Sequence, residues 1–199
     1  MRSLFMALSF APLATGPALH AQVDLTARAG LTWATPLLRD DIIEEVEVRQ
    51  KLAPTLVLGV SLPIAPRYDA GLELTLASSG YRASEAETTT DLGTIRTGSV
   101  TLGLHGPVAT GLKWRAGAGL VGYFPKEEIG IFQSGGTTRF LAGAGIDYRR
   151  PMSSSWQLIA SLRYDFHRFT TDELQSRGFS QSQGVQRISA TVGLAGGSR

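Results

Sequence analysis

The chain has 199 residues, enough for one domain, with 19 basic and 17 acidic side chains and a formal net charge of +2. This near balance lacks the concentrated basic surface that nucleic-acid binding requires, so we predict no nucleic-acid partner. The absence of cysteine excludes a disulfide framework, a thiolate metal site and a cysteine nucleophile. With 23 glycines and only 18% charged residues, the composition is typical of a tightly packed all-β chain.

Residues 1–21 form a predicted signal peptide. Arg2 supplies the positive start, residues 4–14 supply an apolar run, and small residues precede a predicted cut between Ala21 and Gln22. A short N-terminal anchor or a buried helix is the alternative, but the run is shorter than the roughly 20 residues that a membrane helix needs. We expect residues 22–199 to form one domain.

From Val23 onward, apolar side chains alternate with polar ones, which indicates strands with one apolar and one polar face. The clearest example is residues 156–167, where Trp156, Leu158, Leu162 and Phe166 share the apolar face with other even positions. The same pattern predicts eight strands at residues 23–33, 52–62, 68–76, 97–104, 112–124, 139–149, 156–167 and 187–194.

The links between these strands alternate between long and short. The long links are predicted at residues 36–51, 79–92, 125–136 and 168–184, and the short ones at 63–67, 105–111 and 150–155. Within the first long link, Ile42 and Val46 could support one helical turn, or Val46, Val48 and Leu52 could continue the row of the second strand. We favour the projecting strand. An even number of strands joined by alternating long and short links is typical of an antiparallel up-and-down barrel, in which all long links lie at one end.

The alternation fits two environments. A secreted lipocalin-like carrier would turn the apolar row inward around an apolar ligand, whereas a transmembrane barrel would turn it toward lipid. The aromatic residues of the apolar row fall at strand ends, as the two interfaces of a bilayer select, and the polar row is rich in glycine, as a narrow interior requires. We therefore predict an all-β, eight-stranded transmembrane β-barrel. Its girdles comprise Tyr68, Trp114, Tyr148 and Trp156 at the short-link end and Trp33, Phe124, Phe140, Tyr164 and Phe166 at the other.

The polar row carries nine charged side chains that this orientation points into the barrel. Buried charges must be paired, so we expect the acidic members to bind the arginines in an internal network. Eight strands leave room for side chains only, and we predict that the network closes the lumen. A narrow pore preferring anions is the alternative, because basic members outnumber acidic ones. The residues are Arg28, Glu73, Lys113, Arg115, Arg139, Asp147, Arg163, Asp165 and Arg187.

No pattern predicts a cofactor, a metal or a catalytic residue. His105 falls in a predicted short turn, and His167 ends the seventh strand beside Asp165. A lipid-modifying enzyme could use Asp165 and His167 with Ser176 or Ser180, but no spacing demands it. A solvated histidine at the rim is the simpler interpretation.

The signal peptide, the eight strands, the alternating links and the two girdles resemble the small outer-membrane β-barrel superfamily, which includes the outer-membrane protein A transmembrane domain and its X- and W-type relatives. This resemblance covers about residues 23–196. It implies a monomer in the bacterial outer membrane, in contact with lipid and lipopolysaccharide and inserted by the outer-membrane assembly machinery. The chain departs from the family by lacking a terminal aromatic residue, since it finishes Leu194-Ala195-Gly196-Gly197-Ser198-Arg199. We expect a non-enzymatic protein that acts through its long loops.

Overall fold

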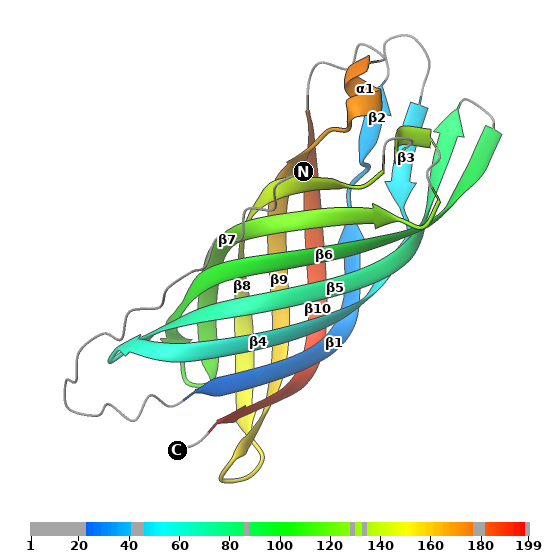
Figure 1. The fold of residues 1–199 in the computed structure, drawn as a ribbon. Helices are drawn as coiled ribbons and strands as arrows, with labels where there is room; N and C mark the ends of the chain where they lie inside the picture. Colours follow the sequence, from blue (N-terminus) through cyan, green and yellow to red (C-terminus); the bar gives the residue numbers. More distant parts are fainter. Residues whose placement is uncertain are drawn as a thin grey trace, which may run out of the picture.

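Eight long strands form a closed, antiparallel up-and-down barrel in the computed structural model (Figure 1). The structure describes residues 23–40, 46–85, 88–127, 130–132, 135–176 and 182–197. Each strand of the ring pairs with the next along the chain, and the first pairs with the last, Asp24 facing Gly197. The ring consists of β1 (Asp24–Ala34), β4 (Ala53–Ala65), β5 (Tyr68–Glu85), β6 (Thr88–Ala109), β7 (Leu112–Pro125), β8 (Thr137–Pro151), β9 (Trp156–Phe169) and β10 (Gln183–Gly197).

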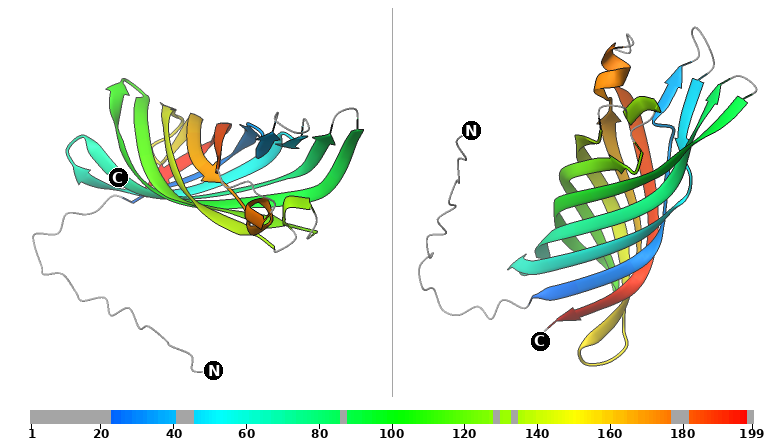
Figure 2. Two further views of the ribbon diagram at one scale, coloured as in Figure 1. Left: turned by 90° about the horizontal axis from the view of Figure 1, so that it is seen from above. Right: turned by 45° about the vertical axis from the view of Figure 1, so that its right-hand side comes forward.

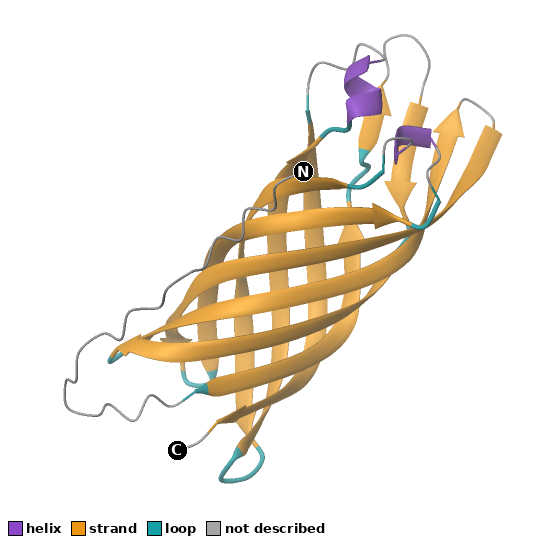
Figure 3. Ribbon diagram, in the orientation of Figure 1, coloured by secondary structure: helices purple, strands orange, loops and turns teal. Residues whose placement is uncertain are grey.

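Four shorter elements lie at the end opposite to the start of β1 and the end of β10 (Figure 2). They are β2 (Leu38–Asp40), β3 (Val46–Gln50), the 3-10 helix η1 (Gly130–Phe132) and α1 (Asp172–Ser176). β3 pairs with the distal part of β5, and β2 pairs with β3, so a small sheet extends beyond the barrel mouth (Figure 3).

The second long link differs from the prediction. Residues 79–92 were expected to be a polar loop, but most of them lie on β5 and β6, which remain paired as far as Glu85 and Thr88. Tyr81 and Leu92 are buried while the remaining side chains are mostly exposed, so this hairpin lacks the long apolar row that reveals the other strands. Its threonines nevertheless favour extended backbone.

Three further predictions are wrong in detail. β4 and β6 run through most of the predicted turns 63–67 and 105–111, with register shifts at Pro63/Ala65 and Pro107/Ala109. Prolines are accepted there because strand ends and bulges do not need every backbone N–H. Val48 and Leu52 do not share one row: Val48 is buried and Leu52 is exposed, because the chain breaks between β3 and β4. The possible helical turn at residues 42–46 lies largely outside the described residues.

The two faces of the wall have opposite chemistry. The outside of the wall exposes leucine, valine, isoleucine and aromatic side chains, for example at even-numbered positions of β4, β5, β7 and β9. Charged and hydroxyl side chains are buried inside. Glycine lines the interior where backbones approach closely. A Cβ at Gly119 would collide with the carbonyl oxygen of Val100, and one at Gly193 with that of Ala27. At these two positions the neighbouring strand leaves no room for a side chain.

Candidate functional site inside the barrel

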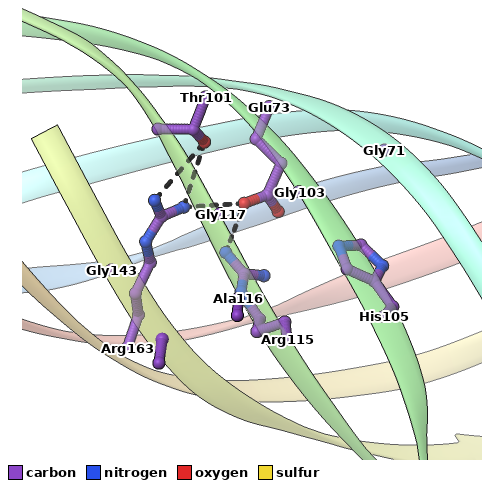
Figure 4. A pocket seen from close by; sticks show the side chains of 11 residues that line it. Gly71, Glu73, Thr101, Gly103, His105, Arg115, Ala116, Gly117, Gly143 and Arg163 are labelled. Carbon is purple, nitrogen blue, oxygen red and sulfur yellow. Dashed lines mark hydrogen bonds and ion pairs between the residues drawn. The ribbon is translucent and has the colours of Figure 1, made fainter.

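Glu73 lies at the centre of a buried charge network (Figure 4). Its carboxylate accepts hydrogen bonds from Arg28 of β1, Arg115 of β7 and Arg163 of β9, the last at 2.8 Å from Nη1 to Oε2. Arg163 also approaches the hydroxyl of Thr101 on β6, at 3.3 and 3.4 Å. One carboxylate therefore connects strands from all sides of the barrel.

Two more carboxylates complete the network. Asp147 of β8 lies 3.4 Å from Arg115 and 3.6 Å from Arg28, and its Oδ1 accepts a hydrogen bond of 2.6 Å from Ser161. Asp165 accepts one of 2.6 Å from Nε of Arg163. Three arginines thus face three carboxylates, so the buried group is neutral overall. Such pairing is what makes ionised groups tolerable in a low-dielectric interior.

The other three residues predicted for this network lie apart from it. Lys113 pairs with Asp69 near the short-link end, at 2.7 Å. Arg139 donates to the backbone carbonyl oxygens of Thr170 and Thr138, at 2.6 and 3.1 Å. The buried Arg187 donates to Thr97 at 3.2 Å, and within the described part of the chain it has no carboxylate partner.

The predicted network left out several inward-facing polar residues. Asp69 binds Lys113, and Asp24 pairs with Arg149 near the short-link end. His105 is buried inside β6, not in a turn, and its Nδ1 has no hydrogen-bond partner among the described residues. The odd-numbered polar row of β6, which includes Thr97, could have placed it there, had Gly106-Pro107 not suggested a turn.

Little space remains around the network. Two cavities flank Glu73 and His105, and each has a volume of about 10 Å³. That volume is at the lower limit for one water molecule. The side chains therefore fill this level of the barrel nearly completely.

Above the network, toward the long-link end, an apolar cluster lies in the lumen next to the buried His167. Fifteen buried side chains form one cluster there, including Leu37 and Val48 from the first long link and Leu174 from α1. We call these fifteen residues the outer cluster: Ala34, Leu37, Leu38, Val48, Tyr81, Leu92, Ile95, Val121, Tyr123, Ile131, Phe132, Leu141, Phe169, Leu174 and Val185.

Phe132 is the centre of the outer cluster. Its ring lies 5.8 Å from that of Tyr81, 6.4 Å from Tyr123 and 5.8 Å from Phe169, between centroids. Offset and edge-to-face ring pairs at such distances are stabilising. This cluster was not predicted, although Tyr123 and Phe169 interrupt the polar row in a way that could have indicated it.

The residues predicted to form two girdles occupy the two ends of the outer wall. Eight of them are exposed, from Phe166 at 41% to Phe140 at 66%. The exception is Trp114, which is half-buried and packs against Tyr68 with ring centroids 6.3 Å apart.

Solved structures with this architecture were found by comparison. Similar structures include the outer membrane protein AlkL in lipid bilayers, with a TM-score of 0.57 and 12% identity, covering 98% of this chain and 97% of that one. OprG from Pseudomonas aeruginosa has a TM-score of 0.53 and 10% identity, covering 90% and 96%. Neisserial surface protein A has a TM-score of 0.51 and 12% identity, covering 87% and 96%. No family model matches the sequence, and a search of curated proteins finds no match.

The chain has the fold of the small outer-membrane β-barrels. The predicted all-β, eight-stranded antiparallel barrel is thereby confirmed. Among the described residues, no helix is long and apolar enough to cross a membrane, and no group of three or more histidine or acidic side chains could bind a metal ion.

His167 and Asp165, the two residues considered for an enzyme, are both buried inside the barrel, so the prediction of a solvated histidine at the rim is wrong. His167 is buried, and its Nε2 hydrogen-bonds to the hydroxyl of Tyr123 at 2.6 Å. Asp165 is bound to Arg163. Ser180 lies outside the described residues.

The sheet beyond the barrel mouth has two perturbed groups. Lys51 donates a 2.9 Å hydrogen bond to Asp91, and this bond, together with one from the Gly93 N–H, lowers the pKa of Asp91. Burial raises the pKa of Tyr81, and the charge of Glu127 adds to the effect. The Tyr81 hydroxyl has no hydrogen-bond partner among the described residues. Burial of this ring therefore leaves a polar group without compensation.

Proposed function

We propose that the chain is a non-enzymatic protein of the bacterial outer membrane, with a closed lumen, that interacts with other molecules through the elements beyond its long-link end. One observation carries the membrane assignment. Large apolar side chains cover the outside of the wall, while ionised side chains fill the inside. A soluble carrier of an apolar ligand requires the opposite distribution, and a lipid-facing barrel requires this one.

The closed lumen rests on two layers in series. The neutral charge network fills the middle of the barrel around Glu73, and the outer cluster fills the long-link end around Phe132. An ion would have to displace both paired arginines and packed rings. The alternative of a narrow pore is supported only by Arg187, a buried cation without a carboxylate partner among the described residues.

The first test uses the three tryptophans, Trp33, Trp114 and Trp156, on the outer wall. In bilayers of brominated phosphatidylcholine, we expect strong quenching of tryptophan fluorescence, greatest for bromines near the interfaces. A protein that stays folded without detergent and shows no quenching would refute the membrane assignment. In planar bilayers we expect no conductance steps, and regular anion-selective steps would refute the closed lumen.

Three parts of the proposal concern biogenesis and assembly. We propose that residues 1–21 are removed on export, that the outer-membrane assembly machinery inserts the barrel, and that it functions as a monomer in contact with lipopolysaccharide. Mature protein beginning at Gln22 is the expected result of N-terminal sequencing. Light scattering of the detergent complex should give one copy per particle.

A further inference from the structure

A groove crosses the outer wall near the long-link end. It has a volume of about 670 Å³ and is lined mainly by apolar groups of β1, β4, β5, β6 and β7, among them Leu56, Leu76 and Phe124. Its size is within the range of ligand sites in proteins. Gly98 lies between its walls: a Cβ at this position would be 3.6 Å from Phe124 and 3.7 Å from Leu76. The missing side chain of Gly98 therefore leaves the groove open.

One cation lies on the rim of this groove. Arg96 precedes Gly98 by two positions on β6, so both face outward, and Arg96 is in register with Phe124 of β7. It is exposed, and the described residues include no hydrogen-bond or ion-pair partner for it. Arg28, Arg115 and Arg163 inside the barrel are all paired with carboxylates. An unpaired guanidinium at the apolar wall is tolerated at a membrane interface, where an anion can bind it.

A second cation lies beside the first. The backbone N–H of Lys126 donates to the carbonyl oxygen of Thr94 at 2.9 Å, so the chain continues along β6 beyond the end of β7. Lys126 is exposed and follows Phe124 by two positions. Diagonal neighbours on adjacent strands are about 7–8 Å apart, so the side chains of Arg96 and Lys126 can reach one anion. The side chain of Lys126 has no partner among the described residues.

Glu127, the residue after Lys126, forms no ion pair with either cation. Glu127 lies 3.5 Å from the position that a Cβ of Gly93 would occupy, and its charge raises the pKa of the buried Tyr81. Among the described residues, the charged side chains on the rim of the groove are therefore the two cations Arg96 and Lys126. Arginine binds phosphate through two parallel hydrogen bonds, and lysine adds a second charge.

We propose that this groove binds a phosphorylated acyl lipid of the outer leaflet, with its phosphate between Arg96 and Lys126 and one acyl chain along Leu56, Leu76 and Gly98. The inference rests on the proposed function, in which the elements beyond the long-link end interact with other molecules and therefore lie on the outer side of the membrane. The phosphate then lies at the level of the aromatic girdle that contains Phe124, which is where lipid headgroups meet the hydrocarbon.

A second groove on the same wall provides an internal control. It also measures about 670 Å³ and lies toward the short-link end, between side chains such as Leu62, Leu104 and Ala118. No basic side chain lines it. It can accommodate hydrocarbon but offers nothing to select a phosphate.

The experiment measures lipid bound to the full chain. Barrels in phosphatidylcholine nanodiscs would be titrated with bisphosphorylated lipid A, and bound copies counted by native mass spectrometry. We expect Arg96→Gln combined with Lys126→Gln to weaken binding about 30-fold, since a basic residue near an anionic lipid surface contributes about fivefold. Gly98→Leu, which fills the groove and keeps both charges, should weaken binding at least tenfold. Ala118→Leu, which fills the second groove, should leave it unchanged.

Two controls identify the ligand and the cause of a failure. Dephosphorylated lipid A should bind to the wild type as weakly as lipid A binds to the double variant, and inorganic phosphate should not compete. Unchanged lipid A binding in the double variant or in Gly98→Leu would overturn the proposal; if Gly98→Leu does not fold, Leu76→Trp fills the same groove. Tryptophan quenching by brominated lipid is measured on every sample. Quenched protein without lipid A selectivity refutes this inference alone, whereas unquenched, folded protein refutes the membrane assignment.

Discussion

Replacing Glu73 with glutamine should destabilise the barrel more than any other single charge removal in the lumen. Its carboxylate faces three arginines, and its side chain is only 8% exposed. Glutamine keeps the shape but removes the charge, which leaves three guanidinium groups facing only Asp147 and Asp165. Removing one partner of a buried ion pair costs about 3–5 kcal/mol, and we expect Glu73→Gln to reach this range. That is a large fraction of the total stability of a typical domain.

The assay is urea unfolding in lipid vesicles, followed by tryptophan fluorescence. Asp69→Asn on the same strand is the matched control, because the Asp69–Lys113 pair is 26% and 32% exposed and should contribute at most about 1 kcal/mol. Combining Glu73→Gln with Arg163→Met removes one charge of each sign and should recover part of the loss. If Glu73→Gln costs no more than Asp69→Asn, the network does not stabilise the barrel as we infer.

Three more perturbations test the packing. Phe132→Ala should cost about 3–5 kcal/mol and speed amide exchange around the outer cluster, whereas Phe140→Ala on the exposed wall should cost much less; equal effects would contradict a shared core. Tyr81→Phe should raise the unfolding temperature, because it removes a buried hydroxyl without a partner among the described residues. The wild type should lose stability above about pH 10, because the raised pKa of Tyr81 means that ionisation of its hydroxyl opposes folding, and this loss should be smaller in the variant. Gly119→Ala should prevent folding into vesicles while Gly98→Ala should fold normally, as judged by circular dichroism, because only the first Cβ collides with backbone.

The ring could be predicted from the sequence because each of its strands has one outward and one inward face, so apolar and polar side chains alternate along it with a period of two. The apolar outer row of residues 156–167 is visible without any structure, and β9 spans Trp156–Phe169. The extension beyond the barrel was not predicted for the converse reason. Residues 88–91 of β6 are all exposed, so polar side chains occupy both faces and no alternation marks the strand.

The individual ion pairs could not be derived from the sequence either. Which face Glu73 and Arg115 occupy follows from alternation, but their contact depends on how far the strands are staggered and tilted around the ring. Arg187 and Thr97 meet across the lumen although 90 residues separate them. The outer cluster was missed because Phe132 comes from a long link, and alternation carries no information about where a link folds.

The division of the lumen into an ionic level and an apolar level implies that temperature acts on the two levels through different physical causes. Apolar burial stabilises less in the cold, so the rings around Phe132 should loosen when the temperature falls. The free-energy cost of desolvating ions decreases as the temperature rises, so burying the arginines around Glu73 costs less in a warm membrane than in a cold one. Cooling therefore weakens both levels of the lumen, the apolar one because burial of its rings stabilises less and the ionic one because desolvating its charges costs more.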